Sequence, residues 1–303
     1  MATSKSWLHA FRLRTLPLAL SSIIVGSALS FFDDAFRIWV CILAVITTIL
    51  LQILSNLAND YGDAVVGTDN KDRVGPERTV QSGAISKKQM LRAIISFSAL
   101  SLISGISLLY IAFEGEFNFT LILFLILGIA AIAAAIKYTV GKNPYGYKGF
   151  GDLFVLIFFG FVGVVGTYFL NTLSFQWDVL LPALSIGLLS VAVLNLNNMR
   201  DIENDAKSGK ITLVFKLGYK KAKIYHILLI LISFIAASEY QFWNFEHHLQ
   251  FLFFLLFPFF IIDLRKIVKI ENPAELDPFL KKTALKTLLF AILLTIGFLS
   301  KSC

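Results

Sequence analysis

The side chains best suited to chemistry in this chain fall in two clusters rich in aspartate and asparagine. The first cluster runs Asn59-Asp60-Tyr61-Gly62-Asp63, with Asp69 shortly after it, and the second consists of Asn197 and the string Asp201-Ile202-Glu203-Asn204-Asp205. Within each cluster, oxygen-bearing side chains recur at every fourth position. If a helix continues through each cluster, these side chains lie in a row along one helix face.

Carboxylate and amide oxygens without histidine or cysteine indicate a hard cation, and Mg²⁺ commonly combines one or two protein carboxylates with the phosphates of a substrate. The chain has four histidines and two cysteines, and they form no metal-binding motif. Acidic groups at the carboxyl ends of apolar helices are also electrostatically unfavourable unless a cation or water compensates them. We therefore predict a Mg²⁺ site between the clusters, the alternative being ordinary solvated loop acids.

Basic residues that could bind a diphosphate lie at the start of the first predicted span, beside both acidic clusters and in the fourth connection. They are Arg14, Arg73, Arg78, Lys142, Lys148, Arg200 and Lys210. Taken singly, each is also explained as a cytoplasmic charge next to a membrane span.

The elements that must position these residues are membrane-spanning helices. The chain has 303 residues, of which 57% are hydrophobic and 16% charged, and its mean hydropathy is +0.75. Apolar runs long enough to cross a bilayer are predicted near residues 15–33, 38–58, 93–113, 118–136, 152–172, 179–198, 224–242, 248–264 and 283–300. We predict an all-α membrane protein with nine transmembrane helices in one bundle and a single domain over residues 1–303.

The distribution of charge predicts the orientation of this bundle. Nearly all of the 27 Lys and Arg residues fall in the N-terminal segment and in alternate connections, whereas the opposite connections are acidic. The positive-inside rule then places the N-terminus in the cytoplasm and the C-terminus outside. The net charge of +7 is explained by topology and by attraction to membrane lipid, so no nucleic-acid partner is predicted.

Both acidic clusters begin long cytoplasmic connections, after the second and the sixth predicted spans. Because four spans separate equivalent points, we predict two four-helix pseudo-repeats plus one helix, which brings both clusters to one cavity mouth. A secondary transporter would also explain repeats and membrane acids, but these acids lie at helix ends and not at mid-membrane. A membrane scaffold without activity would leave the paired motifs unexplained.

At these residues the chain resembles the UbiA superfamily of intramembrane prenyltransferases, which carry an Asn/Asp-rich motif after the second helix and a DxxxD motif after the sixth. The resembling strings are SNLANDYGDAVVGTDN, DRVGPERTVQSGAIS and NNMRDIENDAKSGKITLVFKLG. These strings are similar to the menaquinone-pathway branch of the superfamily. The resemblance implies transfer of a polyprenyl chain from its diphosphate to 1,4-dihydroxy-2-naphthoate, with loss of CO₂ and diphosphate, giving demethylmenaquinone. Another aromatic acceptor, such as 4-hydroxybenzoate, is the alternative.

The resemblance also implies roles for individual residues. By the match, Asn59, Asp63, Asn197, Asp201 and Asp205 would belong to the metal–diphosphate site. We add Asp69 to the expected metal ligands, and the expected catalytic carboxylates are Asp60, Asp63, Asp201 and Asp205. By the resemblance the diphosphate would contact Lys148 and Arg200. From their positions in the sequence we add Lys210, Arg73, Arg78 and Arg14, and we place the acceptor near Tyr138 and Tyr147. The expected location is the bacterial cytoplasmic (inner) membrane, with the active site on the cytoplasmic side.

Overall fold

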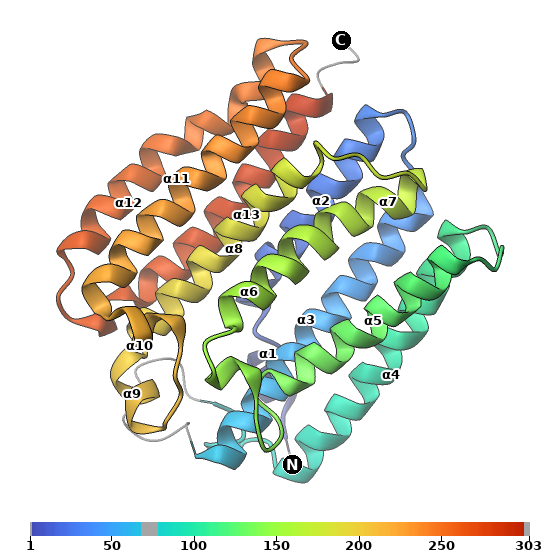
Figure 1. Ribbon diagram of the computed structural model, residues 1–303. Helices are drawn as coiled ribbons and strands as arrows, with labels where there is room; N and C mark the ends of the chain where they lie inside the picture. Colours follow the sequence, from blue (N-terminus) through green and yellow to red (C-terminus); the bar gives the residue numbers. More distant parts are fainter. Residues whose placement is uncertain (1, 68–77, 300–303) are drawn as a thin grey trace.

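A computed structural model of the chain describes residues 2–67 and 78–299, and all regular structure in these ranges is helical (Figure 1). The first half contains α1 (Ser4–Phe11), η1 (Leu13–Thr15), α2 (Leu16–Phe32), α3 (Ile38–Val66), α4 (Lys87–Ala112), α5 (Phe119–Lys137), η2 (Tyr145–Tyr147), α6 (Gly151–Val155), η3 (Leu156–Val165) and α7 (Gly166–Thr172). The second half contains α8 (Leu180–Arg200), α9 (Ile202–Lys207), α10 (Leu213–Leu217), α11 (Tyr219–Trp243), η4 (His248–Leu256), α12 (Phe257–Lys269), η5 (Pro273–Leu276) and α13 (Asp277–Leu299).

Seven helical segments of the described chain are long and apolar enough to cross a membrane. They are Ser4–Phe32, Ile38–Val66, Lys87–Ala112, Phe119–Lys137, Gly151–Thr172, Leu180–Arg200 and Tyr219–Trp243. The consecutive elements η4 and α12, and the 23-residue α13, continue the bundle beyond α11 (Figure 1). The chain is therefore an integral membrane protein by length and composition of its helices.

The long helices form a single bundle in which α8 and α2 are central. α8 packs against α11, η3 and α13, and α2 packs against α13, η3 and α3. At the edges lie α4 and α5 on one side and α11 and α12 on the other (Figure 1). α5 lies at the edge of the bundle (Figure 1) and has no buried residue among its 19.

The span Gly151–Thr172 is held against α2 and α8 by glycine contacts. A Cβ atom on Gly163 would lie 2.7 Å from the Ser22 Cβ, and one on Gly160 would lie 2.7 Å from the Ala183 carbonyl oxygen. The middle of this span, η3, is a π-helix, and the Phe159 carbonyl accepts a hydrogen bond from the Ser22 hydroxyl at 2.5 Å. Side-chain hydrogen bonds of this kind satisfy carbonyls that irregular helix geometry frees.

One helix continues through the first acidic cluster, whereas the second cluster is divided between two helices. α3 runs through Asn59 and Asp63 and ends with Gly67 in the left-handed conformation (φ 85°), so these two side chains share a face as predicted. The prediction of one continuous helix through the second cluster is wrong. α8 ends at Arg200, Asp201 has φ −95° and ψ 9°, and α9 begins at Ile202. The chain therefore turns at Asp201, and Asp205 lies on a separate short helix.

Candidate active site

A cavity of about 440 Å³ lies inside the bundle, enclosed by residues of α2 to α8 and α13. Its charged and asparagine lining residues gather at the end of the bundle that carries the N-terminus, α9 and α10, the lower end in Figure 1. They are Arg12, Arg14, Asn56, Asn59, Asp63, Arg78, Asn197, Lys210 and Lys281. The rest of the cavity is lined mainly by aliphatic and phenyl side chains. The cavity therefore joins a charged mouth to an apolar interior.

Asp63 is the acidic residue of the first cluster that lines this mouth. Its side chain is buried, and its Oδ1 accepts a hydrogen bond from the Tyr147 hydroxyl at 2.7 Å. Its Oδ2 accepts one from Arg78 Nη2 at 3.2 Å. α3 thus presents Asp63 between the connection from α3 to α4, which carries Arg78, and the connection from α5 to α6, which carries Tyr147.

Lys210 connects the two acidic clusters. Its ammonium group lies 3.4 Å from Asp205 Oδ1 and also interacts electrostatically with Asp63 and Asp201. Burial alone would lower the pKa of Lys210, but these carboxylates outweigh burial and raise the pKa above its ordinary value. Burial raises the pKa of Asp205 to about 6, although Lys210 acts in the opposite direction. Carboxylates therefore lie close together near the mouth, and the cationic group of Lys210 favours their ionised form.

The donor set fits a Mg²⁺ ion that completes its coordination with a substrate. Asp205 Oδ2 is buried, and no described residue donates a hydrogen bond to it. Within the described ranges, no group of three or more Asp, Glu, His or Cys side chains is close enough to hold a metal by itself. Amide oxygens of Asn59 and Asn197 and phosphate oxygens would therefore have to supply further ligands, as is usual for Mg²⁺.

Asp60, expected to be catalytic, instead supports the neighbouring connection. It is 1% exposed and does not line the cavity. Its Oδ2 accepts hydrogen bonds from the backbone N–H and the hydroxyl of Thr79 at 3.2 and 2.5 Å. This contact anchors the chain next to Arg78, so Asp60 holds Arg78 near Asp63.

The remaining residues expected to bind substrate are distributed unevenly. Arg14, Arg78, Lys210 and Tyr138 line the cavity, whereas Tyr147, Lys148, Arg200, Asp201 and Asp205 do not. Lys148 is exposed, and its backbone oxygen accepts a hydrogen bond from Lys216 Nζ at 3.1 Å. Arg200 is buried and bound to Asp201 and Asp277. Asp69 and Arg73 lie outside the described residues.

The segment after α5 and the carboxyl-terminal part of α3 approach each other closely at Thr139 and Gly62. A Cβ atom on Gly62 would lie 2.6 Å from the Thr139 carbonyl oxygen, so only glycine fits there. The Thr139 hydroxyl lies within hydrogen-bonding distance of the Ala58 carbonyl and of Asn59 Oδ1. Gly62, inside the first cluster, thus lets the connection after α5 pack directly on α3.

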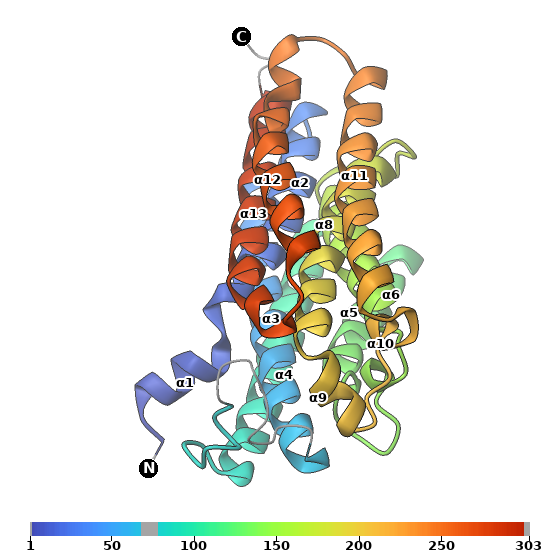
Figure 2. The ribbon, with the colours of Figure 1, turned by 90° about the vertical axis from the view of Figure 1, so that its left-hand side faces the viewer.

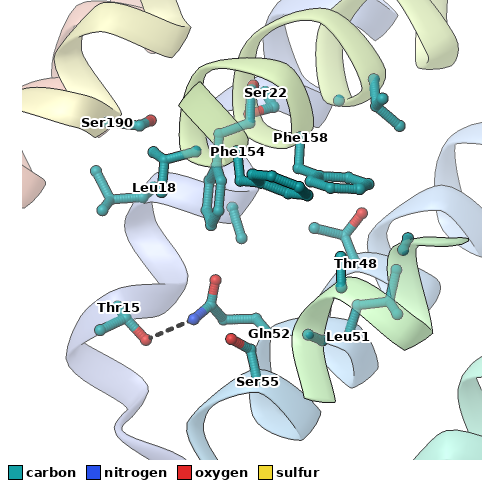
Figure 3. A pocket seen from close by; sticks show the side chains of 18 of the residues that line it. Thr15, Leu18, Ser22, Thr48, Leu51, Gln52, Ser55, Phe154, Phe158 and Ser190 are labelled. Carbon is teal, nitrogen blue, oxygen red and sulfur yellow. Dashed lines mark hydrogen bonds between the residues drawn. The ribbon is translucent and has the colours of Figure 1, made fainter. Parts of the chain in front are cut away.

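Sequence reasoning missed a second polar group deeper in the cavity. The Gln52 amide donates hydrogen bonds to Thr15 at 3.2 Å and, more weakly, to Asn56 at 3.5 Å, and the Asn56 amide donates to Thr15 at 3.0 Å. Across the cavity stand the rings of Phe154 and Phe158 (Figure 3). The available signal was spacing, since Gln52 precedes Asn59 by seven residues and so shares its helix face, about 10 Å away along the axis.

A transmembrane bundle with two aspartate-rich motifs at the mouth of an apolar cavity defines a class of intramembrane enzyme. Residues 19–298 match the model of the UbiA prenyltransferase family. The chain belongs to this family.

The relatives within the family are more specific. The chain is 44% identical over 297 residues to the 1,4-dihydroxy-2-naphthoate octaprenyltransferase of Haemophilus influenzae, covering 97% of this chain and 96% of that protein. It is 42% identical over 302 residues to the enzyme of the same name from Escherichia coli K12, covering 99% and 97%.

Solved structures confirm the fold. A UbiA homolog from Aeropyrum pernix K1 superposes with a TM-score of 0.70 at 18% identity, covering 96% of this chain and 99% of that one. A UbiA homolog from Archaeoglobus fulgidus bound to GPP and Mg²⁺ superposes with a TM-score of 0.61 at 15% identity, covering 95% and 99%.

Proposed function

We propose that this protein transfers a polyprenyl chain from polyprenyl diphosphate to 1,4-dihydroxy-2-naphthoate, releasing diphosphate and CO₂ and giving demethylmenaquinone for menaquinone biosynthesis. The observation that carries the proposal is the cavity, whose charged mouth is lined by Asn59 and Asp63 of the first cluster and Asn197 of the second, and whose interior is apolar. A polyprenyl diphosphate matches this cavity, because its charged diphosphate fits the charged mouth and its hydrocarbon chain fits the apolar interior. Two relatives that align over nearly the whole chain have this acceptor in their names.

The diphosphate would bind at the mouth. Lys210 and Arg78 line it and carry positive charge beside Asp63 and Asp205. Asn59, Asp63, Asn197, Asp201 and Asp205 would hold Mg²⁺, which supplies positive charge to the leaving diphosphate as the allylic C–O bond breaks. Lys210 and Arg78 stabilise the same developing charge through direct contact.

The acceptor would bind deeper, between the polar group around Gln52 and the opposite aromatic wall. Tyr145, Phe154 and Phe158 form that wall by stacking, with ring centroids 3.9 Å apart for the first pair and 6.1 Å for the second. Tyr138 also lines the cavity and contacts the Tyr145 ring edge at 5.3 Å. This apolar enclosure would exclude water, so that the naphthoate ring and not water attacks the allylic carbon.

One experiment tests the reaction itself. Purified protein given polyprenyl diphosphate, 1,4-dihydroxy-2-naphthoate and 4-hydroxybenzoate together should prenylate the naphthoate preferentially. Naphthoate labelled with ¹⁴C in its carboxyl group should lose the label as CO₂. Product identification by mass spectrometry and counting of trapped CO₂ provide the measurement. A labelled product, or preferential prenylation of 4-hydroxybenzoate, would refute the assigned acceptor while leaving prenyl transfer intact.

The proposal includes nine membrane spans in the bacterial cytoplasmic membrane, with the active site on the cytoplasmic side. In support, α1 lies at the end of the bundle that contains the cavity mouth, and α13 runs from that end to the opposite one (Figure 2).

Cysteine labelling tests this orientation. In whole cells, with Cys41 and Cys303 replaced by serine, new cysteines at Lys88 and Ala206 should not react with an impermeant maleimide, whereas cysteines at Glu116 and Glu246 should. All four are exposed positions. Equal labelling of both pairs would disprove the orientation.

A further inference from the structure

Arg200, the last residue of α8, is buried against Asp201, Asp277 and the amide oxygen of Asn197. It does not line the cavity. Its side chain is 0% exposed. Its Nε donates to Asp201 Oδ1 at 2.8 Å and its Nη2 to Asp201 Oδ2 at 2.6 Å, so the pair is bidentate. Nη2 also donates to Asn197 Oδ1 at 3.0 Å. One guanidinium therefore holds two side chains that we assign to the cation.

The third side of this guanidinium faces a different helix. Nη1 donates to Asp277 Oδ1 at 2.6 Å, and Asp277 is the first residue of α13. Asp277 belongs to neither aspartate cluster, and its side chain is 39% exposed. The contact connects the cluster at the end of α8 to the start of the last long helix of the bundle.

The geometry of this contact decides what Arg200 can do. A guanidinium presents its donors in a rigid plane, so a bidentate pair fixes both the position and the rotation of the partner carboxylate. Each carboxylate oxygen has a second lone pair, and Asp201 can therefore still bind a cation while Arg200 holds it. Four of the five N–H donors of this buried guanidinium are used by Asn197, Asp201 and Asp277, so Arg200 could bind a phosphate bidentately only by giving up some of these hydrogen bonds.

We infer that Arg200 and Asp277 are positioning residues that orient Asn197 and Asp201 for the cation, and that Arg200 does not bind the diphosphate. The inference rests on the proposed function, because that proposal assigns Asn197 and Asp201 to Mg²⁺. It predicts that Asp277, on another helix, affects cation affinity through Arg200. Residues that hold a metal ligand by hydrogen bonding usually change metal affinity by 10-fold to 100-fold when replaced.

The test measures binding of Mn²⁺, a spectroscopic substitute for Mg²⁺, to detergent-solubilised protein in the presence of inorganic diphosphate, by electron paramagnetic resonance. Asp277→Asn and Arg200→Lys should each raise the Mn²⁺ dissociation constant about tenfold or more. Asp277→Glu, which keeps the charge, should recover part of the affinity. Glu275→Gln is the matched control, because it removes one exposed negative charge from the same segment without contacting Arg200. Its Mn²⁺ affinity should equal that of the unmodified protein.

Two further measurements separate the possible outcomes. Asp201→Asn tests the cation assignment itself: if it leaves Mn²⁺ affinity unchanged, the proposed site is wrong. If Asp201→Asn weakens binding and neither Asp277→Asn nor Arg200→Lys does, the positioning role is wrong and the site stands. Diphosphate binding in EDTA gives the other criterion. Loss of that binding in Arg200→Lys would make Arg200 a phosphate ligand and overturn the inference. If thermal unfolding shows that Asp277→Asn is not folded, the test rests on Arg200→Lys alone.

Discussion

Replacing Asp63 or Asp205 with asparagine should lower the rate of prenyl transfer by at least a hundredfold, with Asp201→Asn having a similar effect. Each carboxylate interacts with Lys210 at the cavity mouth, and each is proposed to bind the Mg²⁺ that compensates the leaving diphosphate. A hundredfold loss corresponds to about 2.7 kcal/mol of transition-state stabilisation. Asparagine keeps the size of the side chain but removes the charge that attracts the cation. Turnover of each variant in detergent, at saturating Mg²⁺ and at limiting Mg²⁺, gives the measurement.

The second cluster contains its own control for this prediction. Glu203 lies between Asp201 and Asp205 in the sequence, but its side chain is exposed. Glu203→Gln removes the same charge from the same segment and should change turnover less than threefold. Excess EDTA should abolish activity of the unmodified protein, and added Mg²⁺ should restore it. Full turnover in EDTA would reject the metal-dependent mechanism altogether.

Lys210→Gln should reduce kcat/KM for the prenyl diphosphate by about a hundredfold or more, which is the range for loss of one preorganised charge at a reaction centre. Lys210 is 9% exposed, lines the cavity and interacts electrostatically with Asp205, Asp63 and Asp201. The effect should fall on the prenyl donor, because Lys210 lies at the diphosphate end of the cavity. KM for the naphthoate should change little, so separate titrations of the two substrates provide the measurement.

Lys148 supplies a direct comparison with Lys210. The family resemblance implies that Lys148 contacts the diphosphate, whereas the structure places its side chain on the exposed surface outside the cavity lining. Lys148→Gln should therefore change kcat/KM for the donor far less than Lys210→Gln. The reverse order of effects would show that the connection between α5 and α6 must rearrange when the donor binds, and that Lys210 mainly compensates Asp205.

Two properties of this protein followed from its sequence alone because they depend on local spacing and on composition. Apolar runs of sufficient length must become helices in a bilayer, since backbone groups in hydrocarbon have no other partners. Asn59 and Asp63 lie on one face because α3 continues through them, and four residues nearly complete a helical turn. The donor types of the two motifs indicated a Mg²⁺ site, and their resemblance to the UbiA superfamily implied prenyl transfer; membership of the UbiA prenyltransferase family is confirmed.

The direction of individual side chains depended on packing between helices that are distant in the sequence. Asp60 turns toward Thr79, and Arg200 turns toward Asp277, because each meets a partner that spacing within its own helix cannot predict. The same holds for Lys210, which follows the second cluster in sequence and lies beside Asp63 of the first in space. Gln52 faces Phe154 and Phe158 only because α3 and the span Gly151–Thr172 enclose one cavity (Figure 3). A helical repeat determines which residues share a face, whereas tertiary contacts determine what that face meets.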